Sequence, residues 1–453
     1  MGKDGLSGAG VPPGGAVAEP LEIVGGGLAG CEAAHFLAER GHSVRLVEMR
    51  PVRSTPAHGT DRLGELVCTN SFKSEDPANA HGQLKREMEA LGSLLLRAAR
   101  DSRVPAGSAL AVDREMFAQR MTDAVSSHPL IQVVREERLD LPEGPAIIAT
   151  GPLTSDALSA SIRRHLGDDG LSFYDAIAPI VHRESLDEGV VFEAGRFGED
   201  ADYLNCPMDE SEYGAFLDAL LAADLHGGHD FDAVPYFEGC LPVEVMASRG
   251  RDTLRFGPMK PIGLKDPRTG RRPHAVVQLR REDRQGQMWN LVGFQTRLRI
   301  PEQGRVFRRI PGLEHAEFLR WGSIHRNSYL NFPARLTPWG SPPGRPRLLF
   351  AGQLTGVEGY TESAASGLLA AANLRRLLLG REPALPPPTT MLGGLARYLR
   401  EADPRHFQPM NSNWGLVDPL PARVRDRKEK REALAGRALR DFLEWVEKEG
   451  ITS

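Results

Sequence analysis

The sequence predicts an α/β protein in which a parallel-sheet domain is interrupted by a mixed α/β insertion. Three observations predict this fold class. A strand, a glycine-rich turn and a helix follow one another from Leu21, two later apolar strands end at Gly151 and Gly352, and short strands punctuated by Arg and Pro lie between them. The two later strands therefore return to one Rossmann-like nucleotide-binding sheet on either side of an insertion.

The first of these elements is the most informative. The turn Gly25-Gly26-Gly27-Leu28-Ala29-Gly30 stands between the apolar run Leu21 to Val24 and a helical stretch from Cys31 to Arg40. Only glycines permit so tight a turn, and they let backbone N–H groups at the helix N-terminus face a pyrophosphate. A second strand, Ser43 to Val47, ends in Glu48, whose carboxylate can accept hydrogen bonds from a ribose. This order of elements predicts a dinucleotide site.

The chain is expected to divide into four parts. A leader rich in Gly, Pro and Ala occupies residues 1–19 and lacks the apolar core of a signal peptide, so we expect it to be disordered. The nucleotide-binding domain takes residues 20–182 and 326–453, with helices at the C-terminal end, and the insertion takes residues 183–325. In the first part, a long polar segment from Pro51 to Gly82 precedes one helical stretch from Gln83 to Ala99.

A second crossing from strand to helix favours a flavin as the ligand. The strand Arg347 to Gly352 leads through Gln353 into a helix from Glu362 to Leu379, and this helix begins with small residues. Small residues permit close packing on a flat ligand, and a helix N-terminus favours the negative charge of a reduced flavin ring. The alternative is a helix packed on the sheet for structural reasons only.

Composition excludes several classes of protein. No apolar run reaches the roughly 18 residues that span a bilayer, so we expect a cytoplasmic protein without membrane contact. The four cysteines include no C-x-x-C pair, which argues against a disulfide framework and against a zinc site. We therefore expect free thiols and no bound metal.

The four thiols differ in their surroundings. Cys31, in the first helix, and Cys206, before a proline, are predicted to be packing residues. Cys68 follows the first βαβ unit in a polar loop that is rich in cations, and Cys240 lies at a Gly-Cys-Leu-Pro corner. Nearby cations make a thiolate available, so a buried structural residue and a reactive thiol both stay open for Cys68 and Cys240.

The net charge of −4 hides an asymmetry. Between residues 245 and 335 there are 19 Lys or Arg against 7 Asp or Glu, a local charge of +12. This concentration, which includes Arg271, Arg272, Arg280 and Arg281, predicts a positive field that can hold a phosphate backbone. The alternative is a set of solvated arginines that are paired with carboxylates.

Six motifs, in order along the chain, resemble the TrmFO family, the folate- and flavin-dependent tRNA (uracil-5-)-methyltransferases. They are Val47-Glu48-Met49-Arg50-Pro51, Thr55-Pro56-Ala57-His58, Glu65-Leu66-Val67-Cys68-Thr69-Asn70-Ser71, Phe237-Glu238-Gly239-Cys240-Leu241-Pro242, Arg255-Phe256-Gly257-Pro258-Met259-Lys260-Pro261 and Gly352-Gln353-Leu354-Thr355-Gly356-Val357-Glu358-Gly359-Tyr360.

The resemblance implies an FAD-binding domain of the glutathione reductase type and formation of 5-methyluridine in the T-arm of tRNA. Methylenetetrahydrofolate gives the carbon, reduced FAD gives the electrons, and NADPH or NADH restores the reduced flavin. It further implies that FAD is held by the turn from Gly25 to Gly30 together with Glu48, Arg50, Gly352 and Gln353. Cys240 is implied as the nucleophile and Cys68 as the base, with the exchanged roles as an alternative, and no obligate protein partner is expected.

Two other functions stay open at this point. The related flavoprotein MnmG modifies the tRNA wobble uridine, but the chain lacks the long C-terminal helical domain of that family. A flavin-containing RNA-binding protein without catalysis would leave Cys68 and Cys240 inert.

Overall fold

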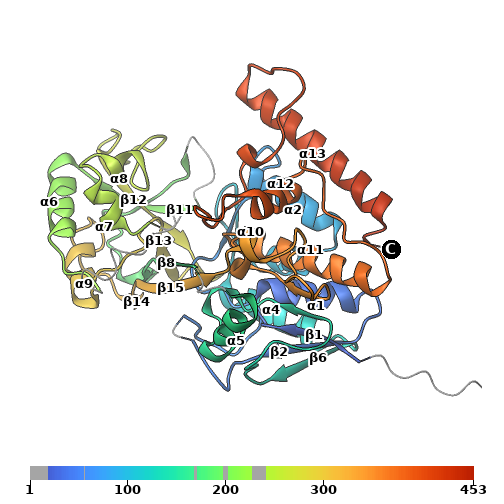
Figure 1. Ribbon diagram of the computed structural model, residues 1–453. Coiled ribbons are helices and arrows are strands. Elements are labelled where there is room, and N and C mark those ends of the chain that lie inside the picture. Colours follow the sequence, from blue (N-terminus) through green and yellow to red (C-terminus); the bar gives the residue numbers. More distant parts are fainter. Residues whose placement is uncertain (1–18, 56, 168–170, 197–201, 227–240, 453) are drawn as a thin grey trace, which may run out of the picture.

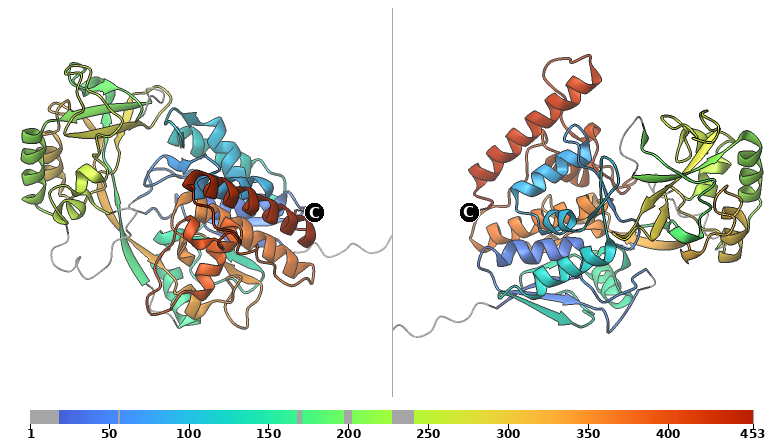
Figure 2. Two further views of the ribbon diagram at one scale, coloured as in Figure 1. Left: turned by 90° about the horizontal axis from the view of Figure 1, so that it is seen from above. Right: turned by 180° about the vertical axis from the view of Figure 1, so that it is seen from behind.

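The computed structural model describes residues 19–55, 57–167, 171–196, 202–226 and 241–452. Figure 1 shows two lobes, a larger one built from both ends of the chain and a smaller one built from its middle. The two further views in Figure 2 show the same division and the strands that join the lobes. Within the described ranges, every helix is too short or too polar to cross a membrane.

A five-stranded parallel sheet forms the centre of the larger lobe, in the order β16-β7-β1-β2-β6. Val24 lies opposite both Val47 and Ile148, so the carboxyl ends of three neighbouring strands meet at one edge. The strands of this sheet are β1 (Leu21–Val24), β2 (Val44–Glu48), β6 (Ile131–Arg135), β7 (Ala146–Ile148) and β16 (Leu348–Phe350).

Both faces of the sheet are covered, which explains why its strands are apolar without alternation. Ile23 packs with the helices α1 and α11 on one face, and Val24 packs with α5 on the other. The helices of this lobe are α1 (Leu28–Ala38), α2 (Ala80–Ala90), α3 (Leu94–Asp101), α4 (Arg114–Ser126), α5 (Asp156–Leu166), α10 (Phe332–Arg335), α11 (Tyr360–Leu378), α12 (Met391–Glu401) and α13 (Arg427–Glu449).

One sequence expectation for this lobe was wrong, and another was incomplete. The single helical stretch expected from Gln83 to Ala99 is two helices, α2 and α3. The chain turns at Gly92, whose φ of +82° favours glycine, and Ser93 then caps α3 by accepting a hydrogen bond from the Leu96 N–H. The polar segment expected before residue 82 also contains a strand, β3 (Ser71–Ser74), which joins β5 (Ala109–Val112) and β4 (Arg103–Val104) in a small sheet.

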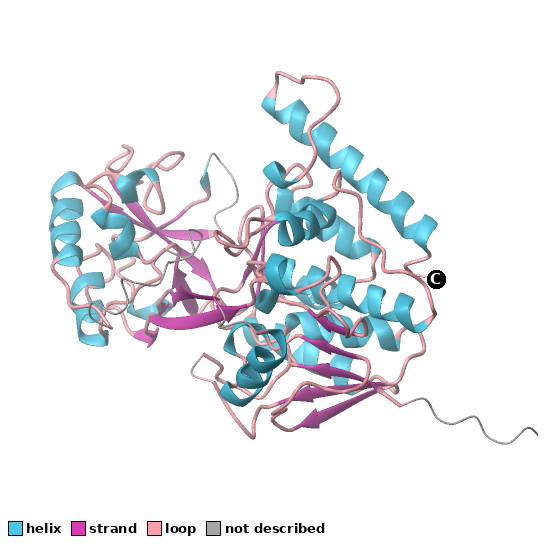
Figure 3. Ribbon diagram, in the orientation of Figure 1, coloured by secondary structure: helices cyan, strands magenta, loops and turns pink. Residues whose placement is uncertain are grey.

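The smaller lobe contains a six-stranded sheet in the order β10-β11-β12-β13-β9-β14, with its own apolar core. Figure 3 shows helices at the outer end of this lobe and strands toward the larger lobe. A two-stranded ribbon of β8 (Leu171–Ile177) and β15 (Ser323–Tyr329) leads into and out of it. The elements are β9 (Ile180–His182), β10 (Phe192–Glu193), β11 (Tyr203–Met208), α6 (Glu210–Leu221), α7 (Val243–Ser248), α8 (Thr253–Phe256), β12 (Ala275–Arg281), β13 (Met288–Leu291), α9 (Ile300–Phe307) and β14 (Phe318–Arg320).

Candidate functional site

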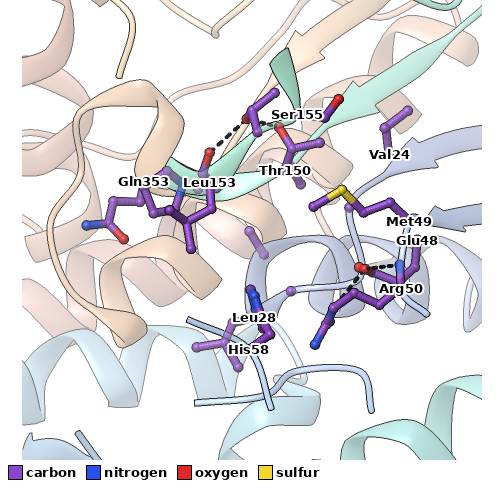
Figure 4. Close-up of a pocket in the computed structure, with 18 of the residues that line it drawn as sticks. Val24, Leu28, Glu48, Met49, Arg50, His58, Thr150, Leu153, Ser155 and Gln353 are labelled. Carbon is purple, nitrogen blue, oxygen red and sulfur yellow. Dashed lines mark hydrogen bonds and ion pairs between the residues drawn. The ribbon is translucent and has the colours of Figure 1, made fainter. Parts of the chain in front are cut away.

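A cavity of about 1020 Å³, including its open mouth, lies at the carboxyl edge of the parallel sheet. Figure 4 shows Leu28, Glu48, Arg50 and Gln353 around it, together with His58. The predicted cofactor-binding residues that line it are Gly25, Gly27, Leu28, Ala29, Glu48, Arg50, Gly352 and Gln353. Gly26 and Gly30 do not line the cavity. Both are closely packed within the turn.

The glycines of the first turn differ in their surroundings. Some are packed against protein atoms, and one faces open space. A Cβ on Gly30 would lie 1.8 Å from the Gly25 carbonyl oxygen, and a Cβ on Gly26 would lie 2.8 Å from a Glu48 carboxylate oxygen. A Cβ on Gly27 would meet no atom within 4 Å, and Gly27 lines the cavity at the N-cap of α1. Gly30 therefore shapes the turn, whereas Gly27 leaves room for a ligand at the helix N-terminus.

Glu48 is buried at the end of β2 and accepts three hydrogen bonds from the protein. They come from the Gly26 N–H at 2.8 Å, the Arg50 N–H at 3.0 Å and Arg50 Nε at 2.8 Å. Burial raises the pKa of Glu48, but the hydrogen bonds and charge of Arg50 and the Gly26 N–H outweigh it, and the pKa lies below its usual value. The carboxylate is thus ionised, fixes the glycine turn, and keeps acceptor capacity toward the cavity.

Arg50 is also buried and holds the loop that follows. Its guanidinium donates to Glu48, to Glu65 at 2.9 Å and to the Thr60 carbonyl oxygen at 3.1 Å. With two carboxylates already bound, Arg50 positions one wall of the cavity.

The second crossing places α11 opposite α1 at the same cavity. Gly352 has a φ of +78°, and a Cβ there would lie 3.1 Å from the Cβ of Ala29. Farther along, a Cβ on Gly367 would lie 2.3 Å from the Ala29 carbonyl oxygen, so small residues let the two helices touch. The N-cap of α11 is Gly359, which supplies no side-chain cap, and Tyr360 and Ser363 of its first turn line the cavity.

Cys68 lies beside this cavity on the loop before β3. Its backbone N–H donates to the Tyr360 hydroxyl at 2.7 Å, and the Thr69 N–H donates to the same oxygen at 3.2 Å. Burial raises the pKa of Tyr360 well above its usual range, so the phenol stays neutral. The first residue of α11 thereby attaches the Cys68 loop to the cavity wall. Cys240 lies outside the described residues.

The other two cysteines lie in cores. Cys31 and Cys206 are fully buried, and burial raises the pKa of each thiol well above its usual range. This agrees with their prediction as packing residues.

Two arginines from other parts of the chain contact the backbone of Cys68. The Cys68 carbonyl oxygen accepts hydrogen bonds from Arg114 and Arg320. Both arginines are far away along the chain, so no local pattern could have identified them.

Some arginines of the basic insertion make contacts within the protein, and others are exposed. Arg271 and Arg272 are exposed, as a phosphate-binding role requires. Arg280 instead donates to Thr69 Oγ1 at 2.6 Å and to the Asn70 side chain at 3.0 Å, and Arg281 lies over the ring of Trp289. Arg280 thus joins the two lobes, whereas Arg271 and Arg272 face solvent.

Comparisons with known proteins show the family of the chain. The family model described as Glucose inhibited division protein A matches residues 20–382. A relative from Geobacter sulfurreducens, named methylenetetrahydrofolate–tRNA-(uracil-5-)-methyltransferase TrmFO, is 57% identical over 94% of this chain and 98% of its own length. A protein of that name from Thermus thermophilus is 54% identical over 94% of this chain and 96% of its own.

A solved structure shares the fold. GidA from Aquifex aeolicus superposes with a TM-score of 0.68 at 16% identity, covering 95% of this chain and 75% of that protein.

Proposed function

The chain belongs to the GidA family and, within it, to the TrmFO group, and we propose that it forms 5-methyluridine in the T-loop of tRNA. Methylenetetrahydrofolate supplies the carbon, and FAD, when bound and reduced, supplies the electrons that convert the added carbon to a methyl group. The observation that carries this proposal is the direct attachment of the Cys68 loop to the wall of the dinucleotide cavity, through the Tyr360 hydroxyl.

The residues of the cavity fit FAD. The open space at Gly27 lies at the N-terminus of α1, where backbone N–H groups stabilise a pyrophosphate, and Glu48 offers an ionised acceptor to a ribose. The α11 N-terminus, with no side-chain cap, lies across the cavity and favours negative charge on a reduced flavin ring. Gly352 and Gln353 line the cavity at the same crossing.

Two thiols supply the remaining chemistry. Uracil C5 is a poor nucleophile until a thiolate adds at C6, and a base must later remove the proton from C5. We assign the addition to Cys240 and the proton removal to Cys68, whose loop is fixed beside the cavity. The target uridine has to leave the T-loop stack to reach them.

NADPH or NADH is the proposed source of electrons for FAD. The sequence has no separate second dinucleotide fingerprint, so the nicotinamide nucleotide docks transiently. The protein acts without an obligate protein partner.

The product and its position in tRNA test this function. After incubation of the FAD-loaded protein with undermodified tRNA, methylenetetrahydrofolate and NADPH, we expect nuclease mapping to find 5-methyluridine in a T-loop fragment. A modified wobble uridine with an unchanged T-loop would instead support an MnmG-like activity. Binding of tRNA without any modified nucleoside would support a non-catalytic RNA-binding flavoprotein.

The exposed arginines of the insertion should set the salt dependence of tRNA binding. For Arg271→Gln with Arg272→Gln, we expect the slope of log affinity against log salt to fall by about 1 for each phosphate that is no longer bound. Filter binding at several salt concentrations measures this slope, and FAD content should not change.

A matched control for this prediction is Arg164→Gln with Arg405→Gln. Both arginines are exposed and ion-paired, and both lie outside the insertion, so the pair removes the same formal charge elsewhere. An equal decrease of slope in the control, or an unchanged slope in the Arg271 and Arg272 variant, would contradict a phosphate contact at these two arginines.

A further inference from the structure

Three arginines from three elements meet at the Cys68 loop. Arg114 begins α4, Arg280 lies on β12, and Arg320 ends β14. Arg114 donates to the Leu66 carbonyl oxygen at 2.6 Å and to the Cys68 carbonyl oxygen at 2.9 Å, and Arg320 donates to that second oxygen at 3.2 Å. Arg280 binds the side chains of the next two residues. We call these three residues the arginine cluster.

The arginine cluster carries more positive charge than its neighbours neutralise. Among the described residues, its guanidinium groups form an ion pair with one carboxylate, the buried Glu282, which binds Arg114. Arg320 Nε is buried and has no hydrogen-bond partner in the described part of the chain. Burial and the nearby charge of Arg114 lower the pKa of Arg320 to about 10. These surroundings therefore destabilise its charged form.

Holding the loop does not require this excess of charge. Neutral amide donors can bind carbonyl oxygens with a smaller desolvation penalty than a guanidinium, and a buried unpaired cation is costly. The unpartnered Nε and the unbalanced charge therefore point to an anion that arrives with a substrate. Because the cluster binds the loop that carries a thiol assigned to uracil chemistry, the anion should belong to the reacting nucleotide.

A ring oxygen fits this position better than a phosphate. An extruded uridine carries its base deepest into a protein, while its phosphates stay near the mouth. All three arginines are partly buried, and the Cys68 loop lies directly against them. In the uracil ring, C4 is bonded to C5. A protein group that can reach C5 can therefore also reach the oxygen on C4.

We propose that the arginine cluster, with Arg320 as its free donor, stabilises the enolate oxygen that develops on uracil C4 when a thiolate adds at C6. In that step the sulfur lone pair forms the C6–S bond, the C5=C6 π pair moves to C4–C5, and the C4=O π pair moves onto the oxygen. No oxidant or reductant takes part. This inference rests on the proposed function, and it assigns the cluster a role like that of an oxyanion hole.

Adduct formation with a 5-fluorouridine T-loop RNA tests this role, since the adduct requires the enolate. With FAD-loaded protein at saturating RNA, we expect Arg320→Gln to slow adduct formation by roughly 10²-fold, the usual effect of removing an oxyanion donor. Arg320→Lys should restore part of the rate because it keeps the charge. RNA affinity and FAD content should stay close to those of the unchanged protein.

Glu282→Gln is the matched control, because it disturbs the Arg114 contacts while removing a negative charge. If the cluster acts through charge, this variant should slow adduct formation far less than Arg320→Gln does. Equal slowing by both variants would mean that the cluster only holds the loop. A decrease of RNA affinity and salt slope at an unchanged saturated rate would assign it to a phosphate, and either result overturns the proposal. A lack of adduct in the unchanged protein would contradict the proposed function itself.

Discussion

Cys240→Ser should abolish both methylation and adduct formation while the protein folds and retains FAD. Serine keeps the shape of cysteine, but its hydroxyl is far too weakly acidic to add to uracil C6. We expect no detectable covalent complex with a 5-fluorouridine T-loop RNA in denaturing electrophoresis, whereas the unchanged protein forms one.

Cys68→Ala should reduce methylation by roughly 10²–10⁴-fold, the range for removal of a general base, because thiolate addition stays possible without it. The adduct should therefore still form. If Cys68→Ala abolishes the adduct and Cys240→Ser does not, the two roles are exchanged.

Substitutions at the buried thiols serve as controls for both variants. Cys31→Ala and Cys206→Ala remove fully buried groups, so they should change thermal stability and leave the adduct intact. An active Cys240→Ser protein would exclude Cys240 as the nucleophile.

Gly27→Ala should weaken FAD binding by at least tenfold, about 1.4 kcal/mol, without lowering the stability of the apoprotein. The added methyl group meets no protein atom within 4 Å, and Gly27 lines the cavity where the pyrophosphate is expected. Its backbone φ of −77° suits alanine, so the apoprotein should be unchanged or more stable by less than about 1 kcal/mol. Flavin fluorescence titration and thermal unfolding without FAD measure the two effects.

Two further glycines give this experiment its controls. Gly144→Ala also meets no atom within 4 Å, but Gly144 does not line the cavity, so FAD affinity should not change. Gly30→Ala places a methyl group 1.8 Å from the Gly25 carbonyl oxygen. It should therefore lower the stability of the apoprotein and also weaken FAD binding. Full FAD affinity in Gly27→Ala would contradict the assignment of this turn to the pyrophosphate.

Much of the larger lobe could be predicted because its signals are local. The strand expected at Leu21 to Val24 is observed with those bounds, and the glycine turn leads directly into α1. Short polar elements gave no such signal. The four residues of β3 include two serines and a lysine, and their pairing with β5 depends on residues more than thirty positions away.

The surroundings of Cys68 could not be predicted for a related reason. Its carbonyl oxygen is bound by residues 46 and 252 positions away, which meet only after the insertion packs against the larger lobe. The charge count correctly found a basic insertion, but sequence could not separate the exposed Arg271 and Arg272 from the internally bound Arg280. The hydrogen bond that Glu48 accepts from the Gly26 N–H could not be predicted either, because it forms only in the folded turn.

Transfer of isotope-labelled carbon from methylenetetrahydrofolate into tRNA tests the central claim most directly. The FAD-loaded protein is incubated with undermodified tRNA, NADPH and folate labelled in the methylene carbon, and the nucleosides are then separated. The proposed function predicts label in 5-methyluridine, in an amount equal to the 5-methyluridine formed, and none with Cys240→Ser. Unlabelled 5-methyluridine, or label in no nucleoside at all, would contradict it.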